Sequence, residues 1–229
     1  MPPNKALNRD ALQQASLAFG RPLALTLGVT NSRMNTALPF PPSPKARADL
    51  KPGALYAIDG ADSYIYYGQV ASNKQIGFFR FRSREILIHE ALAAPLMSRF
   101  GVIYPSIGTA LRAGKWAGLG RHELKPELLE EPLLVQWPAG TLTVTLWKGG
   151  NILGSTVVHD PEIQDLEIIA AYDATYHVPQ RLQADFCETA DAWTAGGSIR
   201  RERLKKQDMA ARFPHQPWHQ LPVDWVKVQ

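Results

Sequence analysis

The chain has 229 residues, of which 45% are hydrophobic and 20% are charged, and its formal net charge is +4. This is the composition of a folded globular protein, and it excludes a mainly disordered chain. The longest apolar stretch near the start, residues 23–29, is interrupted by Thr26 and Gly28. It is too short to span a membrane, so we expect no membrane segment.

The single cysteine and the sequence of the first residues indicate the compartment. Cys187 has no second cysteine to pair with, and a domain of this size does not need disulfides for stability. Arg21 and Pro22 directly precede the short apolar stretch, and no small-residue cleavage site follows it. We therefore expect a cytoplasmic protein.

The first 45 residues predict a helix and a proline-rich linker. Apolar residues recur at helical spacing from Ala11 to Phe19, and four prolines lie between Pro39 and Pro44, where they favour extended backbone. We therefore expect three parts. They are an N-terminal helix and linker at residues 1–45, a single folded domain at 46–200 and a basic tail at 201–229.

Three short β-type runs follow the linker, at residues 54–59, 64–70 and 76–81. Turn-forming sequences separate them, which predicts an antiparallel meander of three strands. Tyr64 and Tyr66 alternate with other large residues, so this strand has aromatic side chains on both faces. One face is expected to be exposed and able to bind a partner; the alternative is cross-strand packing of the tyrosines.

The remaining elements mix helices and strands. Ser83 is predicted to cap a helix that ends near Pro95, after which the chain is expected to be irregular. Threonine alternates with larger apolar residues in 141–147, and glycines precede a second run at 152–158, which predicts a β-hairpin. Residues 166–172 predict another strand.

A last helix is predicted from the apolar spacing of Leu182, Phe186, Ala190 and Trp193. Strands and long helices do not alternate regularly along the chain, which argues against a doubly wound parallel sheet. The predicted fold class is α+β, with a mostly antiparallel sheet made of a meander and a hairpin, and a few packed helices.

No motif in the sequence predicts a catalytic, metal or cofactor site. Cys187 lies on the predicted last helix, where a free cysteine is usually a small buried hydrophobic residue. His215 and His219 are four residues apart, but Pro214 and Pro217 make a helix there unlikely and no third ligand is close. We therefore expect no enzyme, no metal and no cofactor.

Four segments between residues 52 and 193 follow one another in a characteristic order. They are Gly53–Gly60 with Tyr66–Val70 and Ile76–Phe79; Gly114–Gly120, leading to Leu124–Leu128; Asp165–Asp173 with His177 and Arg181; and Phe186 with Trp193. In this order they resemble the immunity protein 26 family of bacterial polymorphic toxin systems. The resemblance covers most of the chain.

The resemblance implies a cytoplasmic protein that binds a cognate toxin and neutralises it by occlusion, without turnover. On this basis the predicted partner-binding residues are Tyr64, Tyr66, Trp116, Asp173, His177 and Arg181. Other interpretations stay open, namely a core position for Trp116 and a helix cap for Asp173. The glycines of these segments, among them Gly53 and Gly118, are interpreted as turn or close-approach positions.

Two other functions stay open. A basic run of Arg200, Arg201, Arg203, Lys205 and Lys206, with Arg212 beyond it, is either a solvated helix face or a nucleic-acid-binding surface. The second alternative is an enzyme with an unfamiliar site centred on Asp173 and His177.

Overall fold

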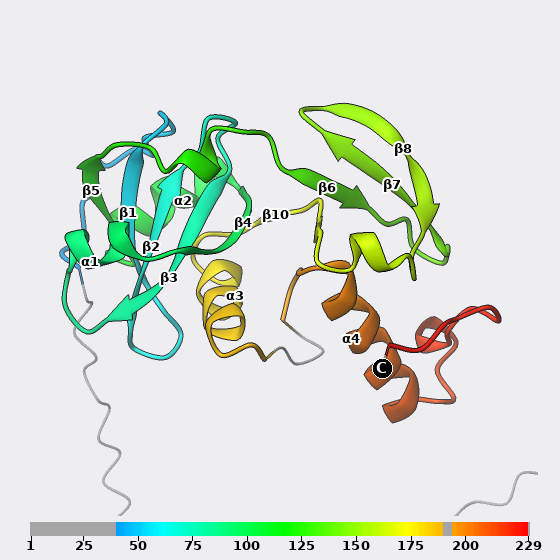
Figure 1. Ribbon diagram of the computed structural model, residues 1–229. Coiled ribbons are helices and arrows are strands. Elements are labelled where there is room, and N and C mark those ends of the chain that lie inside the picture. The colour runs from blue at the N-terminus through cyan, green and yellow to red at the C-terminus, as the bar shows by residue number, and fades with distance from the viewer. Residues whose placement is uncertain (1–39, 190–193, 229) are drawn as a thin grey trace, which may run out of the picture. The chain divides into compact units, whose positions relative to one another are not determined.

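The computed structural model describes residues 40–189 and 194–228 of the chain. Within them, strands form a six-stranded sheet and a four-stranded sheet, accompanied by four α-helices (Figure 1). Most strand pairs are antiparallel, which confirms the expected α+β class. The helix predicted from Ala11 to Phe19 lies outside the described residues, as does Trp193.

The larger sheet has the strand order β10-β4-β3-β2-β1-β5. Its strands are β1 (Ala54–Asp59), β2 (Ile65–Val70), β3 (Ile76–Ser83), β4 (Leu96–Val102), β5 (Trp116–Arg121) and β10 (Ala171–Tyr172). Strands β1 to β3 pair antiparallel in sequence order, so the predicted meander is confirmed.

Both faces of this sheet are covered, so the prediction that one face of β2 would be exposed is wrong. Tyr66 and Tyr67 point to opposite faces, and each has 0% exposure. The Tyr66 face packs against residues of α2 (Tyr104–Arg112) and α3 (His177–Phe186). The Tyr67 face packs against Phe40 and α1 (Ile88–Ala93).

The start of the folded part lies earlier than predicted. Phe40, inside the proline-rich segment, is 2% exposed and belongs to the core on the Tyr67 face. The hydroxyl of Tyr56 accepts a hydrogen bond from the Asp49 amide and donates one to the Asp49 carbonyl. The predicted boundary at residue 46 therefore falls within packed structure.

The segment after the meander differs from its prediction. Ser83 ends β3 instead of capping a helix, and its hydroxyl is hydrogen-bonded to the Tyr67 hydroxyl at 2.8 Å. Helix α1 begins only at Ile88. The region after Pro95, predicted to be irregular, forms β4, α2, β5, the short 3-10 helix η2 (Pro126–Leu128) and strand β6 (Leu133–Gln136). Apolar and polar residues do not alternate regularly in β4, so the sequence carries no strand signal there.

The smaller sheet has the order β8-β7-β6-β9 and contains the predicted hairpin. Strands β7 (Thr143–Lys148) and β8 (Asn151–Val157) pair antiparallel across Gly149 and Gly150, which both have positive φ angles. The strand predicted at residues 166–172 is split in two. Strand β9 (Glu167–Ile168) pairs parallel with β6 in this sheet, and β10 pairs parallel with β4 in the other.

Helix α4 (Ile199–Arg212) packs on the smaller sheet through Ile199, which is fully buried with Val135 and Val144. The short 3-10 helices are η3 (Pro161–Ile163), before β9, and η4 (Pro217–His219), after α4. The predicted domain boundary at residue 200 falls inside α4. The C-terminal residues are held by Arg203, which donates a hydrogen bond to the carbonyl of Val226.

The burial of two tyrosines predicts that the fold becomes less stable in alkaline solution. Burial raises the pKa of Tyr56 and of Tyr172 from 10.0 to about 12. The contribution of each is therefore complete below pH 10.0, the unfolded value, and is lost as the pH rises towards about 12. We expect the free energy of unfolding to fall by about 2–3 kcal/mol per tyrosine over this range, measured by urea denaturation at a series of pH values.

The control for this prediction is Tyr172→Phe. The Tyr172 hydroxyl is buried near the Arg181 guanidinium but makes no well-formed hydrogen bond with it, so its removal should change stability little at neutral pH. The variant should lack the part of the alkaline destabilisation that Tyr172 causes in the unmodified protein. An unchanged pH profile would contradict the assignment.

Candidate binding surface

Three of the six predicted partner-binding residues have interior side chains. Tyr66 is 0%, Trp116 1% and Arg181 2% exposed. The Trp116 indole donates a hydrogen bond to the carbonyl of Ala174 at 3.0 Å, and the Tyr66 hydroxyl donates one to Asp62 at 2.8 Å. For Trp116 the structure therefore favours the core interpretation.

The other three predicted residues are at least partly accessible. The ring of Tyr64 is half-buried under Arg82, whose guanidinium carbon lies 4.3 Å from the ring centroid. The carboxylate of Asp173 accepts hydrogen bonds from the amides of Thr175 and Tyr176, in the turn before α3. No side chain of the described residues caps the helix itself, so the interpretation of Asp173 as its cap is wrong. His177 is exposed. The six residues do not form one exposed surface, and their role in binding stays a prediction.

Arg181 is the centre of a buried charge network. Its guanidinium binds both carboxylate oxygens of Glu167, at 3.0 and 2.8 Å, and its Nε lies 2.8 Å from Asp185. Arg201 also pairs with Asp185. Burial lowers the pKa of Arg181, but the bonds to the two carboxylates outweigh this and raise it, so the guanidinium stays charged. The network connects α3, β9 and α4.

The basic run on α4 has little free charge, because most of its cations have acidic partners. The ion pairs are Arg200 with Asp165, Arg201 with Asp185, Lys205 and Lys206 with Glu202, and Arg212 with Asp208. Arg203 is only 4% exposed and donates hydrogen bonds to Gln164 and Val226. The run therefore offers nucleic acid fewer unpaired cations than its sequence suggests.

The single cysteine does not lie where it is predicted. Cys187 follows the last residue of α3 and is exposed, so the prediction of a buried cysteine is wrong. Helix α3 ends at Phe186, so Cys187 does not continue the apolar face of the helix. Among the described residues, no group of three or more His, Cys, Asp or Glu side chains could hold a metal ion.

The β7–β8 hairpin presents apolar side chains to solvent. In β8, Ile152 is 62%, Leu153 59% and Val157 43% exposed. The register shifts between Leu146 and Trp147, which leaves Leu153 without a direct partner on β7. Residues 141–158 contain a single charged residue, Lys148. We call β8 with the adjoining outward side chains of β7 the hairpin surface.

The hairpin surface also has an open backbone edge. Strand β8 is the terminal strand of its sheet and pairs only with β7 among the described strands. Edge strands in proteins are usually protected by charged residues or proline, and β8 contains neither. Sequence reasoning identified the hairpin but not its exposure, although the low charge of residues 141–158 was a signal for it.

Comparisons of the chain with protein-family models, with curated proteins and with solved structures found no match. The resemblance to the immunity protein 26 family therefore stays a prediction from the four sequence segments. Within the described part of the chain, no helix is long and apolar enough to cross a membrane.

Proposed function

We propose that this protein is an immunity protein that binds a cognate bacterial toxin and neutralises it by occlusion. The observation that best supports the proposal is the hairpin surface, an uncharged edge strand with three exposed apolar side chains. Exposed apolar side chains are frequent at protein interaction sites.

The geometry of β8 favours a protein partner over a small ligand. An extended segment of the toxin can pair with the free edge of β8 through backbone hydrogen bonds. Ile152 and Val157 then supply apolar contact, together with β7 side chains that share their face by register, Thr143 and Trp147. Each fully buried aliphatic side chain would contribute about 1.5–3 kcal/mol to binding.

Occlusion requires no chemistry from the immunity protein. The toxin is inactivated for as long as its functional surface is covered, so the lifetime of the complex decides protection. Neutralisation by imitation of nucleic acid is not favoured, because the chain has a net charge of +4. The proposal therefore requires a toxin with an apolar strand or an acidic surface near its active site.

Capture of the partner from the native host tests this proposal. The tagged protein is purified at moderate salt, and co-purifying proteins are identified by mass spectrometry. We expect a polymorphic-toxin C-terminal domain in near-equal amount, whose toxicity is abolished by co-expression of this chain. Recovery of nucleic acid alone, or failure of the chain to protect cells from any toxin encoded beside it, would refute the proposal.

A matched pair of leucine substitutions tests the surface. Leu153 on β8 and Leu129 after η2 are each 59% exposed. We expect Leu153→Lys to weaken toxin binding by about 100-fold, because a charge enters the desolvated contact, and Leu129→Lys to leave it unchanged. Titration calorimetry measures both affinities. Equal effects of the two substitutions would exclude the hairpin surface as the contact.

A further inference from the structure

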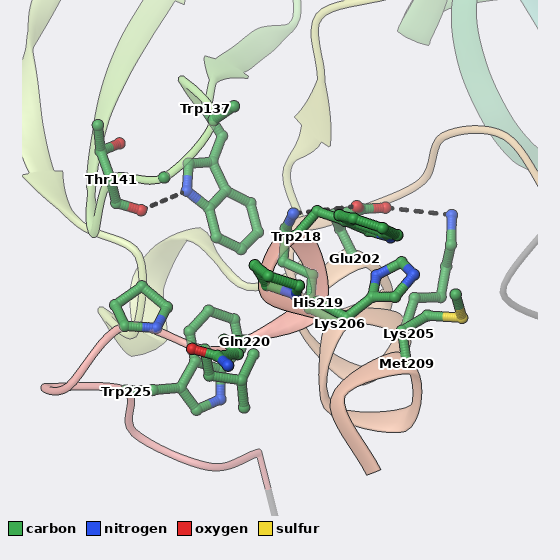
Figure 2. Close-up of a pocket in the computed structure, with 15 residues that line it drawn as sticks. Trp137, Thr141, Glu202, Lys205, Lys206, Met209, Trp218, His219, Gln220 and Trp225 are labelled. Carbon is green, nitrogen blue, oxygen red and sulfur yellow. Dashed lines mark hydrogen bonds and ion pairs between the residues drawn. The ribbon is translucent and has the colours of Figure 1, made fainter. Parts of the chain in front are cut away.

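A groove lined by tryptophans lies between α4, the β6–β7 connection and the C-terminal segment (Figure 2). Its volume is about 560 Å³. This is within the range of small-molecule sites, roughly 300–1,000 Å³. We call it the tryptophan groove and define it by Trp137, Glu202, Lys205, Lys206, Trp218 and Trp225.

The C-terminal wall of the groove is fastened by specific bonds. The side-chain oxygen of Gln207 accepts hydrogen bonds from the Trp225 indole at 3.2 Å and from the amide of Val228 at 2.6 Å. Arg203 binds the carbonyl of Val226 at 2.6 Å. Residues 225–228 are thus held against α4, and the groove is a built feature of the fold.

Of the three tryptophans, Trp218 has the ring that is open to a ligand. Trp137 and Trp225 are stacked, with centroids 6.0 Å apart and planes at 18°. Their indole N–H groups already donate to Thr141 and Gln207, so neither needs a ligand acceptor. Trp218 is 74% exposed, which leaves a large aromatic face without a partner of its own size. This exposed face suits a planar ring.

The charges at the groove favour an anion. Figure 2 shows the carboxylate of Glu202 between the ammonium groups of Lys205 and Lys206, which lie 3.1 and 3.8 Å from it. Two cations therefore share one carboxylate. Lys206 is the more loosely held, and its Nζ also lies 5.1 Å from the Trp137 ring centroid. A ligand anion can bind this ammonium beside the aromatic face.

A second, adjoining cavity of about 240 Å³ shares Trp137, Glu202 and Lys206 with the groove and is also lined by Tyr172. The Tyr172 hydroxyl is buried and has no hydrogen-bond partner among the described residues.

We propose that the tryptophan groove binds a phosphorylated nucleoside, either as a free mononucleotide or within a single strand. Its base stacks on the exposed indole of Trp218, and its phosphate binds the Lys206 ammonium. This site is separate from the hairpin surface, so it does not depend on the toxin-binding proposal.

Quenching of tryptophan fluorescence by AMP, GMP, CMP and UMP tests the site. We expect saturable binding of at least one of them, with the matching nucleoside and inorganic phosphate each bound about 10-fold or more weakly. If none of the four nucleotides binds, or if phosphate alone binds as tightly, the proposal is wrong. Titration with a short single-stranded oligonucleotide then distinguishes the two forms of the ligand. A site for single-stranded nucleic acid would bind the oligonucleotide much more tightly than the mononucleotide.

Variants separate this site from general charge attraction. Lys206→Gln should weaken nucleotide binding about 10-fold without affecting the nucleoside, and Trp218→Ala should weaken both. The control is Arg212→Gln, on the same helix but not lining the groove, which should stay within about 2-fold. Equal weakening by Lys206→Gln and Arg212→Gln would overturn the proposal. Circular dichroism checks that each variant is folded.

Discussion

Replacement of Arg181 by alanine is expected to lower the free energy of unfolding by about 3–5 kcal/mol. The guanidinium is 3% exposed and makes four hydrogen bonds to Glu167 and Asp185, whose side chains are 16% and 7% exposed. Without it, two largely buried carboxylates lose their main counter-charge. Arg201 would still pair with Asp185, but no other cation is recorded beside Glu167 in the described part of the chain.

The contribution of packing is separated from that of charge by a second substitution. Arg181 also lies over the ring of Phe100, with its guanidinium carbon 4.8 Å from the centroid. Arg181→Met keeps apolar packing against this ring but removes the charge, so a loss as large as that of Arg181→Ala would identify the loss of the charge, and with it the uncompensated carboxylates, as the cause.

Urea denaturation at neutral pH measures both variants, with Arg212→Ala as the control. Arg212 makes an exposed i,i+4 pair with Asp208, and such pairs contribute about 0.3–0.5 kcal/mol. A loss below about 1 kcal/mol for Arg181→Ala would mean that water enters the network and solvates the carboxylates.

The position of Arg181 shows where sequence reasoning reaches its limit. The resemblance implies a partner-binding role for Arg181, and an arginine is usually exposed, so the sequence favours an accessible side chain. Its burial depends on Glu167, which reaches it from β9 of the other sheet. Sequence patterns report local periodicity, and a contact between α3 and a strand of the smaller sheet leaves no trace in that periodicity.

Local chemistry, in contrast, was predictable. Alternating threonines and the Gly149–Gly150 turn define the β7–β8 hairpin. Strand β2 was predicted correctly as a strand but not in its burial, because the helices that cover its two faces come from distant parts of the chain. The tryptophan groove gave no signal, since Trp137 and Trp225 meet only through the fold.

Two glycines with the same sequence interpretation are expected to differ sharply. Gly53 and Gly118 were both interpreted as turn or close-approach positions, but only Gly53 fits. It has a φ angle of +86°, and a β-carbon there would lie 2.4 Å from the carbonyl oxygen of His122. Around Gly118 nothing lies within 4 Å of such a carbon, and its φ is not positive, so that interpretation of Gly118 is wrong.

Gly53→Ala is therefore expected to destabilise the fold by about 2–5 kcal/mol, the sum of left-handed backbone strain and overpacking. The backbone cannot move away, because the Gly53 amide donates to Val70 at 2.9 Å and its carbonyl accepts from His122 at 3.0 Å. The β-carbon would clash with His122, which is also hydrogen-bonded to Gly53. Relief of the clash would therefore break the bonds that hold Gly53 to the ends of β2 and β5.

Gly118→Ala should be neutral or stabilise by about 0.5 kcal/mol, because alanine restricts the unfolded chain and meets no neighbour in β5. Thermal unfolding of the two variants gives the comparison directly. Similar melting temperatures of the two variants would show that the backbone at Gly53 and His122 can shift enough to relieve the clash, despite the two hydrogen bonds of Gly53. A large loss for Gly53→Ala alone would establish that the edge of the larger sheet is fixed by backbone geometry, independently of its side chains.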